Sequence, residues 1–347
     1  MSSKILVTGG LGFIGSHTVV ALQEKGFEVV IIDNLSNSSL DVLAGITKIT
    51  QKTPAFENIE LRDKSQVKEF FEKYPEIDSV IHFAASKAVG ESVENPLLYY
   101  ENNLTTLTYL LQELQQKKQA NFIFSSSCTV YGQADQLPIT EDAPVKKAES
   151  PYGNTKQIGE EIIADTAKIN KNFKAISLRY FNPIGAHPSA EIGELPIGTP
   201  QNLVPFITQT AIGKRKELSV FGDDYPTEDG TCIRDYIHVM DLAQAHVIAM
   251  ERLREQKEKS NYEVFNLGTG KGSSVLEVIN SFERSTGQKL PYKIVDRREG
   301  DITAAYADTE KANKELGWKT KRHLDEALKS AWEWQKKVVK EEEEAAQ

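Results

Sequence analysis

Short apolar runs alternate with amphipathic stretches through the first half of the chain. The apolar runs have the length and composition of buried strands, and they cover residues 4–8, 28–33, 79–84, 121–126 and 175–181. The stretches between them repeat apolar residues at helical spacing, and they cover residues 13–25, 65–73, 96–117 and 152–170. Strands that alternate with helices in this way pair in parallel and carry helices on both faces of their sheet. The pattern therefore predicts an α/β fold built on a doubly wound parallel sheet of the Rossmann type.

The alternation breaks at about Asn182, where segments rich in proline and glycine begin to interrupt it. The helices and strands expected after this point are shorter than those before it. A chain of 347 residues is long enough for two lobes. We expect a first domain, a smaller α/β lobe from which the chain re-enters that domain, and a charged tail, and these parts cover mainly residues 1–181, 182–340 and 341–347.

Charge and cysteine content narrow the classes of partner. The net charge is −9, so the chain has no surplus of basic residues with which to neutralise nucleic-acid phosphates. Two cysteines, Cys128 and Cys232, form no disulfide framework. The first residues do not resemble a signal peptide, and no apolar run approaches the ~20 residues of a membrane helix. We expect a cytoplasmic protein that binds neither nucleic acid nor a membrane.

A glycine-rich turn follows the first apolar run, in the stretch VTGGLGFIGSH. Gly9, Gly12 and Gly15 lie between that strand and the first helix, where a Cβ would block both the tight turn and the approach of a pyrophosphate to backbone N–H groups. Asp33 ends the second strand, 18 residues after Gly15, near the offset of a carboxylate that binds a ribose hydroxyl. Because a carboxylate repels a 2′-phosphate, the pattern favours NAD over NADP. The alternative is a glycine turn without a ligand.

A tyrosine and a lysine lie four residues apart in the stretch SPYGNTK. Ser150 and Pro151 mark a helix start, so Tyr152 and Lys156 lie one turn apart on one face. A phenol has a pKa of ~10, and lowering it by ~3 units takes roughly 4 kcal/mol of preferential interaction with the phenolate. We expect the Lys156 ammonium and a positive nicotinamide ring to supply that interaction together. The alternative is an ordinary surface pair. The serine run, Ser125 to Ser127, at the end of the preceding strand argues against this alternative.

These motifs identify a resemblance to the extended short-chain dehydrogenase/reductases, and within them to enzymes that epimerise UDP-sugars at C4′. The resemblance extends to about Trp334, through the stretches HFAASKAVGES, FSSSCTVYG, RYFNPIGAHPS, FGDDYPTEDGTCIRDYIHV and RREGD. It implies that the first domain binds NAD and that the smaller lobe binds the nucleotide sugar. The implied activity is reversible C4′ epimerisation of UDP-glucose and UDP-galactose, in galactose metabolism, by transient hydride transfer to tightly bound NAD.

The resemblance also implies roles for individual residues. The implied catalytic residues are Ser127, Tyr152 and Lys156. The residues implied to contact NAD are Gly9, Gly12, Phe13, Ile14, Gly15, Asp33, Asn34, Leu35, Ser36, Asn37, Ser38, Glu60, Leu61, Phe83, Ala84, Ala85, Lys87, Asn102, Ser127, Tyr152, Lys156 and Phe181. The residues implied to contact the nucleotide sugar are Lys87, Ser127, Tyr152, Asn182, Asn202, Leu203, Ser219, Val220, Phe221, Arg234, Tyr236, the segment from Arg298 to Asp301, and Ala305. Glu60 and Leu61 depart from the Asp-Ile that the family usually has beside the adenine.

Two other functions remain open. Related enzymes that dehydrate or decarboxylate nucleotide sugars add an acid directly after the catalytic Ser or Thr, whereas Cys128 and Thr129 follow Ser127 here. A non-catalytic NAD-binding sensor would normally have lost the tyrosine or the lysine, and this chain has both. The sequence therefore favours simple epimerisation.

Substrate breadth, metal content and assembly complete the expectations. Enzymes restricted to glucose and galactose tend to carry a tyrosine four residues after Asp301, so Ala305 predicts activity on UDP-GlcNAc and UDP-GalNAc unless Tyr306 fills the space.

We expect no metal site, because the six histidines show no ligand spacing, and we expect His82 to be a hydrogen-bonded core residue. The resemblance implies a homodimer that pairs helices 96–117 and 152–170 in a four-helix bundle.

Overall fold

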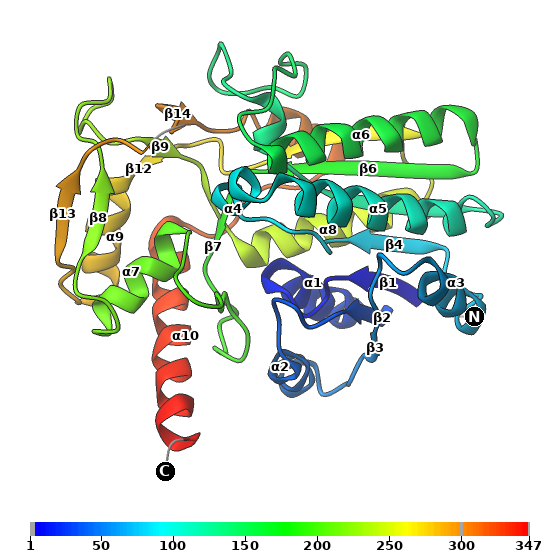
Figure 1. Ribbon diagram of the computed structural model, residues 1–347, viewed down its shortest axis with the longest axis horizontal. Helices are drawn as coiled ribbons and strands as arrows, with labels where there is room; N and C mark the ends of the chain where they lie inside the picture. The colour runs from blue at the N-terminus through cyan, green and yellow to red at the C-terminus, as the bar shows by residue number, and fades with distance from the viewer. Residues whose placement is uncertain (1–3, 299–300, 346–347) are drawn as a thin grey trace.

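The computed structural model describes residues 4–298 and 301–345. Glu299 and Gly300, inside the expected substrate segment, therefore lie outside the described residues, as do Ala346 and Gln347 of the expected tail. Figure 1 shows a larger lobe built around one sheet and a smaller lobe beside it. We call these the large lobe and the small lobe.

A seven-stranded parallel sheet forms the centre of the large lobe, in the order β11-β6-β5-β4-β1-β2-β3 (Figure 1). The strands are β1 (Lys4–Thr8), β2 (Glu28–Asp33), β3 (Ala55–Asn58), β4 (Ser79–His82), β5 (Ala120–Ser127), β6 (Phe173–Tyr180) and β11 (Tyr262–Leu267). The predicted doubly wound parallel sheet is confirmed, and each of the five predicted strands is present. The sequence analysis did not predict β3 or β11.

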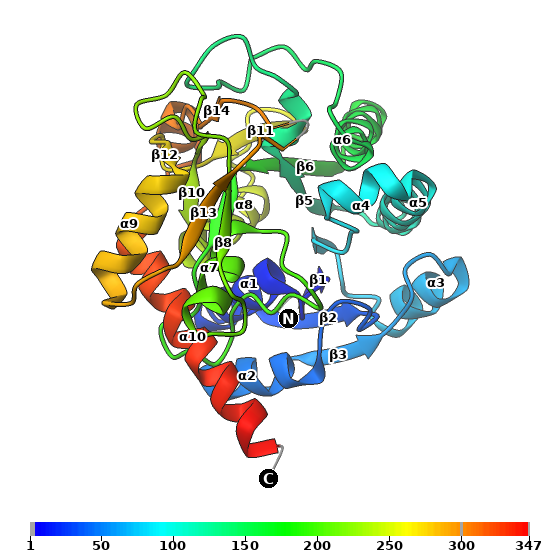
Figure 2. The same ribbon diagram turned by 60° about the vertical axis from the view of Figure 1, so that its left-hand side comes forward.

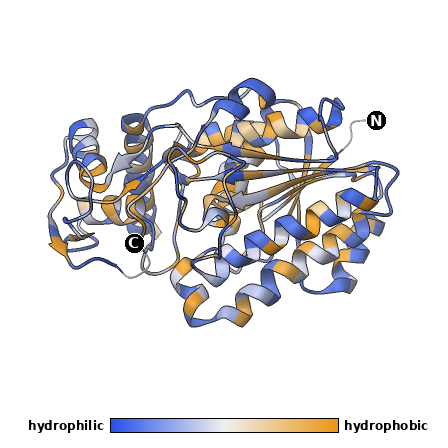
Figure 3. Cartoon of the chain, turned by 90° about the horizontal axis from the view of Figure 1, so that it is seen from above, coloured by the Kyte–Doolittle hydropathy of each residue, from blue (hydrophilic) through white to orange (hydrophobic). Residues whose placement is uncertain are grey.

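Helices cover both faces of this sheet. They are α1 (Phe13–Glu24), α2 (Leu40–Thr50) and α8 (Val239–Arg254) on one face, and α3 (Lys64–Lys73), α5 (Pro96–Leu114) and α6 (Pro151–Ile169) on the other. Alternate side chains of each strand enter the two cores: Ile5 and Val7 pack with α1 and α8, whereas Leu6 packs with α3 and α5. Figure 3 shows the hydrophobic colours gathered along the central strands and the hydrophilic colours on the outer sides of the helices.

The small lobe has its own core, between three helices and a two-stranded parallel sheet (Figure 2). Its elements are α7 (Leu203–Ala211), β8 (Leu218–Phe221), α9 (Val275–Thr286), β13 (Tyr292–Val295) and α10 (Leu324–Ala345). Trp332 of α10 packs edge-on against Phe282 of α9, with 5.8 Å between the ring centroids. Two residues of α7, Val204 and Ile207, complete this core.

The remaining elements are short. They are α4 (Val89–Glu94), η1 (Cys128–Tyr131), β7 (Asn182–Ile184), β9 (Ile233–Arg234), β10 (Tyr236–His238), β12 (Ser273–Ser274), β14 (Ala304–Ala305) and η2 (Ala312–Leu316). Although α8 and β11 lie beyond Asn182 in the sequence, α8 packs on α1 and β11 pairs with β6. Within the described residues, no helix combines the length and the apolarity that a membrane crossing requires.

Candidate active site

The glycine turn leaves the N-terminus of α1 open. Gly9 has a φ of +65°, in the region that favours glycine, and a Cβ at Gly15 would lie 2.1 Å from the Gly9 carbonyl oxygen. Gly12 caps α1 without a side-chain hydrogen bond, and the first turn of the helix has no acidic residue. No capping side chain occupies the first N–H groups of α1, and no carboxylate of the first turn opposes an anion at its positive dipole end, which suits a pyrophosphate.

Asp33 connects the glycine turn to the loop after β2. Its Oδ2 accepts a hydrogen bond from the Leu11 N–H at 3.1 Å, and its Oδ1 accepts bonds from the Leu35 N–H at 3.0 Å and the Ser38 hydroxyl at 2.8 Å. Leu35 has a φ of 59°, which is uncommon for a residue with a side chain. The Asp33 carboxylate therefore holds a strained turn beside the α1 N-terminus.

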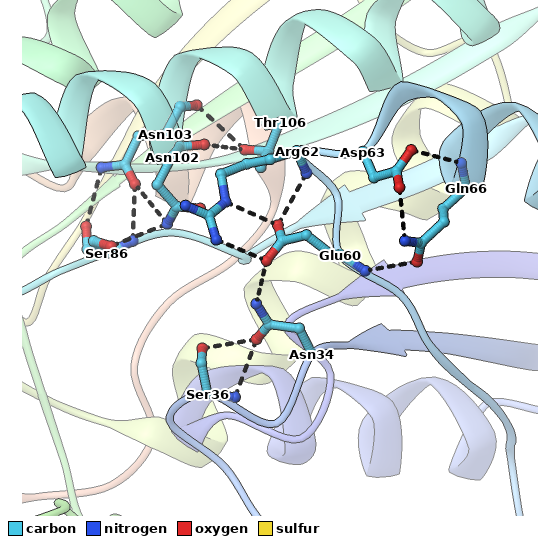
Figure 4. Close-up of polar contacts among 10 residues, drawn as sticks. All are labelled: Asn34, Ser36, Glu60, Arg62, Asp63, Gln66, Ser86, Asn102, Asn103 and Thr106. Atoms are coloured by element: carbon cyan, nitrogen blue, oxygen red, sulfur yellow. Dashed lines mark hydrogen bonds and ion pairs between the residues drawn. The ribbon is translucent and has the colours of Figure 1, made fainter.

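At Glu60 the sequence departs from the family pattern. Both oxygens of the Glu60 carboxylate accept hydrogen bonds from other residues of the protein (Figure 4). Its Oε1 accepts the Arg62 backbone N–H and Nε, and its Oε2 accepts Arg62 Nη2 at 2.9 Å and Asn34 Nδ2 at 3.1 Å. These bonds, the one from the Arg62 side chain above all, lower the pKa of Glu60 to about 2. The four donors occupy the lone pairs of the carboxylate. The Leu61 side chain is buried in the core beneath α3 and α5, so it does not face this loop.

Helix α5 fixes the loop that follows β4 (Figure 4). Asn103 accepts a hydrogen bond from the Ser86 N–H at 2.8 Å, donates to the Ser86 carbonyl at 3.0 Å, and donates to Thr155 Oγ1 at 3.0 Å. Asn102, the expected NAD contact, donates to the Ser86 hydroxyl at 2.9 Å. In the same loop Phe83 packs on His246, 4.7 Å between ring centroids, and Lys87 is exposed. The sequence analysis did not single out Ser86, Asn103 or Thr155.

The tyrosine–lysine pair lies at the start of α6, against the end of β5. As predicted, α6 begins with Ser150 as its cap, whose hydroxyl accepts the Gly153 N–H at 3.1 Å. Lys156 is 4% exposed, and its Nζ donates to the Ser125 carbonyl at 2.6 Å. The same Nζ lies 5.8 Å from the centroid of the Tyr152 ring. Lys156 is therefore buried and Tyr152 is half-buried, with the ammonium near the Tyr152 ring, and this placement disagrees with the alternative of an ordinary surface pair.

The protein alone does not lower the pKa of the phenol. Burial raises the pKa of Tyr152 to about 12, and the Ser127 hydroxyl opposes this rise. Burial lowers the pKa of Lys156 to about 8, and Glu160 opposes this fall. The expectation that Lys156 and a positive nicotinamide together favour the phenolate stays a prediction. In the protein alone, burial raises the pKa of Tyr152, and the Lys156 ammonium donates to a backbone carbonyl.

Arg234 and Arg298 converge on a single carboxylate. Arg298 donates to Asp301 Oδ1 at 2.8 Å and to Oδ2 at 3.2 Å, and Arg234 Nη2 donates to Oδ1 at 3.3 Å. The Arg298 guanidinium also lies 5.5 Å from the centroid of the exposed Phe221 ring. Two guanidinium groups share one carboxylate, so the cluster keeps a positive surplus that suits a diphosphate.

The other expected sugar contacts lie on β7, β8 and β10 and at the start of α7. Asn182 of β7 and Tyr236 of β10 are register partners. Ser219 and Val220 lie on β8, where the Val220 side chain points into the small-lobe core. Asn202, just before Leu203 at the start of α7, donates to Glu194 Oε1 at 2.7 Å. Glu194 was not predicted.

Ala305 is the register partner of Arg234 and belongs to a small apolar cluster with Phe181 and Cys128. The side chain of Tyr306 lies against Gly272 instead: a Cβ on Gly272 would be 3.2 Å from the Tyr306 ring. Tyr306 directly follows the last residue of β14, and its ring lies beside Gly272, whereas Ala305 belongs to the cluster around Phe181.

His82 is a hydrogen-bonded core residue, as expected. His82 Nδ1 shares a 2.7 Å hydrogen bond with Thr8 Oγ1, and burial lowers the pKa of His82 to about 3. No described residues form a group of three or more His, Cys, Asp or Glu that could hold a metal ion.

Comparisons with known proteins agree with this geometry. The family model for GDP-mannose 4,6 dehydratase matches residues 6–331. A UDP-glucose 4-epimerase from Erwinia amylovora is 49% identical, over 96% of this chain and 97% of its own.

Two solved structures are also similar. The UDP-glucose-4-epimerase from Stenotrophomonas maltophila, with bound NAD and formylated UDP-arabinopyranose, has a TM-score of 0.94 at 46% identity and covers 98% of this chain and 99% of its own. The enzyme from Bifidobacterium longum, in complex with NAD+ and UDP, has a TM-score of 0.92 at 46% identity and covers 97% and 99%. The chain therefore belongs to the UDP-glucose 4-epimerase family, within the short-chain dehydrogenase/reductases.

Proposed function

We propose that the protein interconverts UDP-glucose and UDP-galactose by inverting the sugar at C4′, with NAD as a permanently bound cofactor. The observation that carries the proposal is the placement of the buried Lys156 beside the half-buried Tyr152, with 5.8 Å from Nζ to the ring centroid, against the end of β5, the strand that ends in Ser127. The open N-terminus of α1 supports a dinucleotide site in the same lobe. Family membership supports the reaction and its place in galactose metabolism.

The cofactor would be held by the loops at the carboxyl ends of β1, β2 and β4. The α1 N-terminus suits the pyrophosphate, and Asp33 has an Oδ2 lone pair left for a ribose hydroxyl beside its bond to Leu11. Glu60 contributes indirectly in this proposal, because Arg62 and Asn34 already occupy its oxygens. NAD⁺, when bound there, supplies the acceptor that takes the hydride from C4′ and gives it back.

The side chains of the large lobe would manage the proton. An acid–base pair alone cannot epimerise C4′, because no neighbouring carbonyl stabilises a carbanion there. Tyr152 takes the proton of the 4′-hydroxyl and later returns it, and Ser127 donates a hydrogen bond to the same oxygen. Lys156 and the positive charge of the oxidised cofactor together offset the burial that raises the pKa of Tyr152.

The small lobe would hold the nucleotide end of the substrate. Arg234 and Arg298 offer two guanidinium groups to the diphosphate, and they would exchange part of their bonding with Asp301 for phosphate oxygens. With its diphosphate held there, the oxidised sugar would turn so that the hydride returns to its other face, and Tyr152 would return the proton to the 4′-oxygen. We propose accordingly that residues 1–181 form the NAD-binding domain and that most of residues 182–340 bind the nucleotide sugar.

A direct assay tests this function. The purified protein, with no NAD added, is expected to convert UDP-galactose into UDP-glucose until both are present at equilibrium. A product lighter by one water would indicate a dehydratase, in keeping with the name of the matched family model. Bound NAD with no change in either sugar would indicate a sensor. Either of these results would reject the proposal.

We further propose that the substrate range includes UDP-GlcNAc and UDP-GalNAc. Ala305 adds only a methyl group to the cluster around Phe181, and the Tyr306 ring lies beside Gly272. Replacing Ala305 with tyrosine is expected to lower kcat/KM for UDP-GlcNAc at least tenfold, since one overlapping contact costs about 1–3 kcal/mol, and to affect UDP-glucose less. Steady-state kinetics on both sugars measures this. Equal losses on the two sugars, or a wild-type protein inactive on UDP-GlcNAc, would contradict it.

We also propose a homodimer through α5 and α6, located in the cytoplasm. The two helices pack side by side. Leu97, in the first turn of α5, and Ile169, the last residue of α6, are exposed. Both cysteines are free thiols, which suits a reducing compartment. Sedimentation equilibrium should give the mass of two chains, and a monomer at micromolar concentration would argue against the assembly.

A further inference from the structure

A buried ion pair lies behind the tyrosine–lysine pair, between α6 and β6. Arg179 of β6 donates two bonds from Nε and Nη2 to the two oxygens of Glu160, at 2.9 and 2.5 Å. The two side chains are 7% and 9% exposed. Arg179 also donates to the Tyr131 hydroxyl at 2.9 Å, and that hydroxyl donates to Asn266 at 2.6 Å. Such a pair is stable only while both charges are present, because removal of one leaves the other buried and uncompensated.

Glu160 is tied to the strand segment that carries the reacting groups. The Ser126 hydroxyl donates to Glu160 Oε1 at 2.5 Å. Ser126 stands between Ser125, whose carbonyl accepts the Lys156 ammonium, and the catalytic candidate Ser127. Tyr152, Lys156 and Glu160 follow one another at intervals of four on α6, so they form one stripe along the helix. Glu160 thus contacts the end of β5 on one side and lies one turn from the lysine on the other.

The charges around Lys156 come from several elements. Those that face it or its neighbours are Tyr152 and Glu160 on α6, His82 on β4, Arg179 and Tyr180 on β6, and Tyr99 on α5. His82 is neutral, because burial lowers its pKa to about 3, and burial keeps the Tyr99 and Tyr180 phenols protonated. Glu160 and Arg179 are therefore the fixed charges nearest to the lysine in this group.

We propose that Glu160 is a positioning residue for the epimerisation: with Arg179 it holds the end of β5 against α6 and keeps the Lys156 ammonium from facing an unpaired guanidinium. The inference rests on the proposed function. Burial lowers the pKa of Lys156 to about 8, and the Glu160 carboxylate opposes that fall. Activity that needs the ammonium should be present below this pKa and be lost as the pH rises through it.

Four variants test the proposal by the pH at which kcat falls on the alkaline side of its pH profile, which we call the alkaline limb. In the Glu160→Gln variant the limb is expected to move down by roughly one pH unit or more, since a nearby negative charge is lost. In Arg179→Met it is expected to move up, since a positive charge is lost. The double variant removes both charges and should return the limb close to its wild-type position. Glu161→Gln, the same change at the exposed neighbouring position, should leave the profile unchanged.

The outcomes separate this inference from the proposed function. A folded Glu160→Gln variant with an unmoved limb would overturn the inference, and so would limbs that move in the same direction in the two single variants. If Glu160→Gln does not fold, Arg179→Met and the double variant decide: an upward shift that the double variant cancels supports the proposal, and no shift overturns it. A wild-type protein that epimerises nothing would instead reject the proposed function.

Discussion

Replacing Tyr152 with phenylalanine is expected to lower kcat at least a thousandfold and to leave NAD bound. The change removes the hydroxyl that exchanges the proton with the substrate, and general acid–base catalysis contributes up to about 10⁴-fold. The ring remains, so its edge-on contact with Tyr99, at 6.5 Å between centroids, is kept. The turnover of UDP-galactose, measured beside the NAD content of the same preparation, tests this expectation.

A matched control separates the chemistry from folding. Tyr109→Phe makes the same change on α5, in a ring that packs at the edge of the core beneath α3 and α5, and it should leave turnover and NAD content unchanged. If the Tyr152→Phe variant kept more than about a tenth of wild-type turnover, another group would have to carry the proton, and the assignment of Tyr152 would be withdrawn.

Replacing Gly15 with alanine is expected to remove most of the bound NAD, and the activity with it. The added Cβ would lie 2.1 Å from the Gly9 carbonyl oxygen and 3.0 Å from the Gly10 Cα, and both are backbone atoms that cannot rotate away. Forced displacement of packed atoms costs about 1–3 kcal/mol, so NAD affinity should fall about ten- to hundredfold. NAD released on denaturation, counted per chain, measures the effect.

Gly90→Ala is the control for this variant. Gly90 lies on α4, and an added Cβ there would meet only the end of the Gln201 side chain, at 3.8 Å. Its NAD content should equal that of the wild-type protein. A Gly15→Ala protein with a full complement of NAD would show that the turn is not the pyrophosphate site.

The fold was predictable where local pattern and burial agree. Strands β1, β2 and β5 are apolar runs buried on both faces, and α6 carries its start signal in Ser150 and Pro151. The edge strand β3 was missed because it has only four residues, two of them exposed. Strand β11 was missed because its pairing with β6 joins residues distant in the sequence, and no local pattern records such a partner. Helix α2 comes after a polar loop and was not among the predicted helices, although its sequence is amphipathic.

The site was predictable where function constrains residue types at fixed spacing. The glycine turn and the tyrosine–lysine pair could be found because their residues are neighbours both in the sequence and in space. Asp33 could be found because it ends the next strand, at a fixed offset from the turn. The convergence of Arg234 and Arg298 on Asp301 needed the structure, because β9 and the segment before β14 meet only through the fold. The same holds for the bonds of Asn103, which reach two other elements.

Electrostatics was the least predictable property. One helical turn between Tyr152 and Lys156 favours a lowered phenol pKa in isolation, whereas burial acts in the opposite direction and dominates in the protein alone. The desolvation of a group depends on every element packed around it, so spacing along one helix cannot give its sign.

The fate of the hydrogen on C4′ tests the central claim most directly. UDP-galactose labelled with deuterium at C4′ should be incubated with the purified protein in ordinary water, and the UDP-glucose formed should be analysed by mass spectrometry. Hydride transfer within a closed site, with Tyr152 handling only the hydroxyl proton, predicts that nearly all product keeps its deuterium at C4′. Replacement of the deuterium by hydrogen from water would contradict the account.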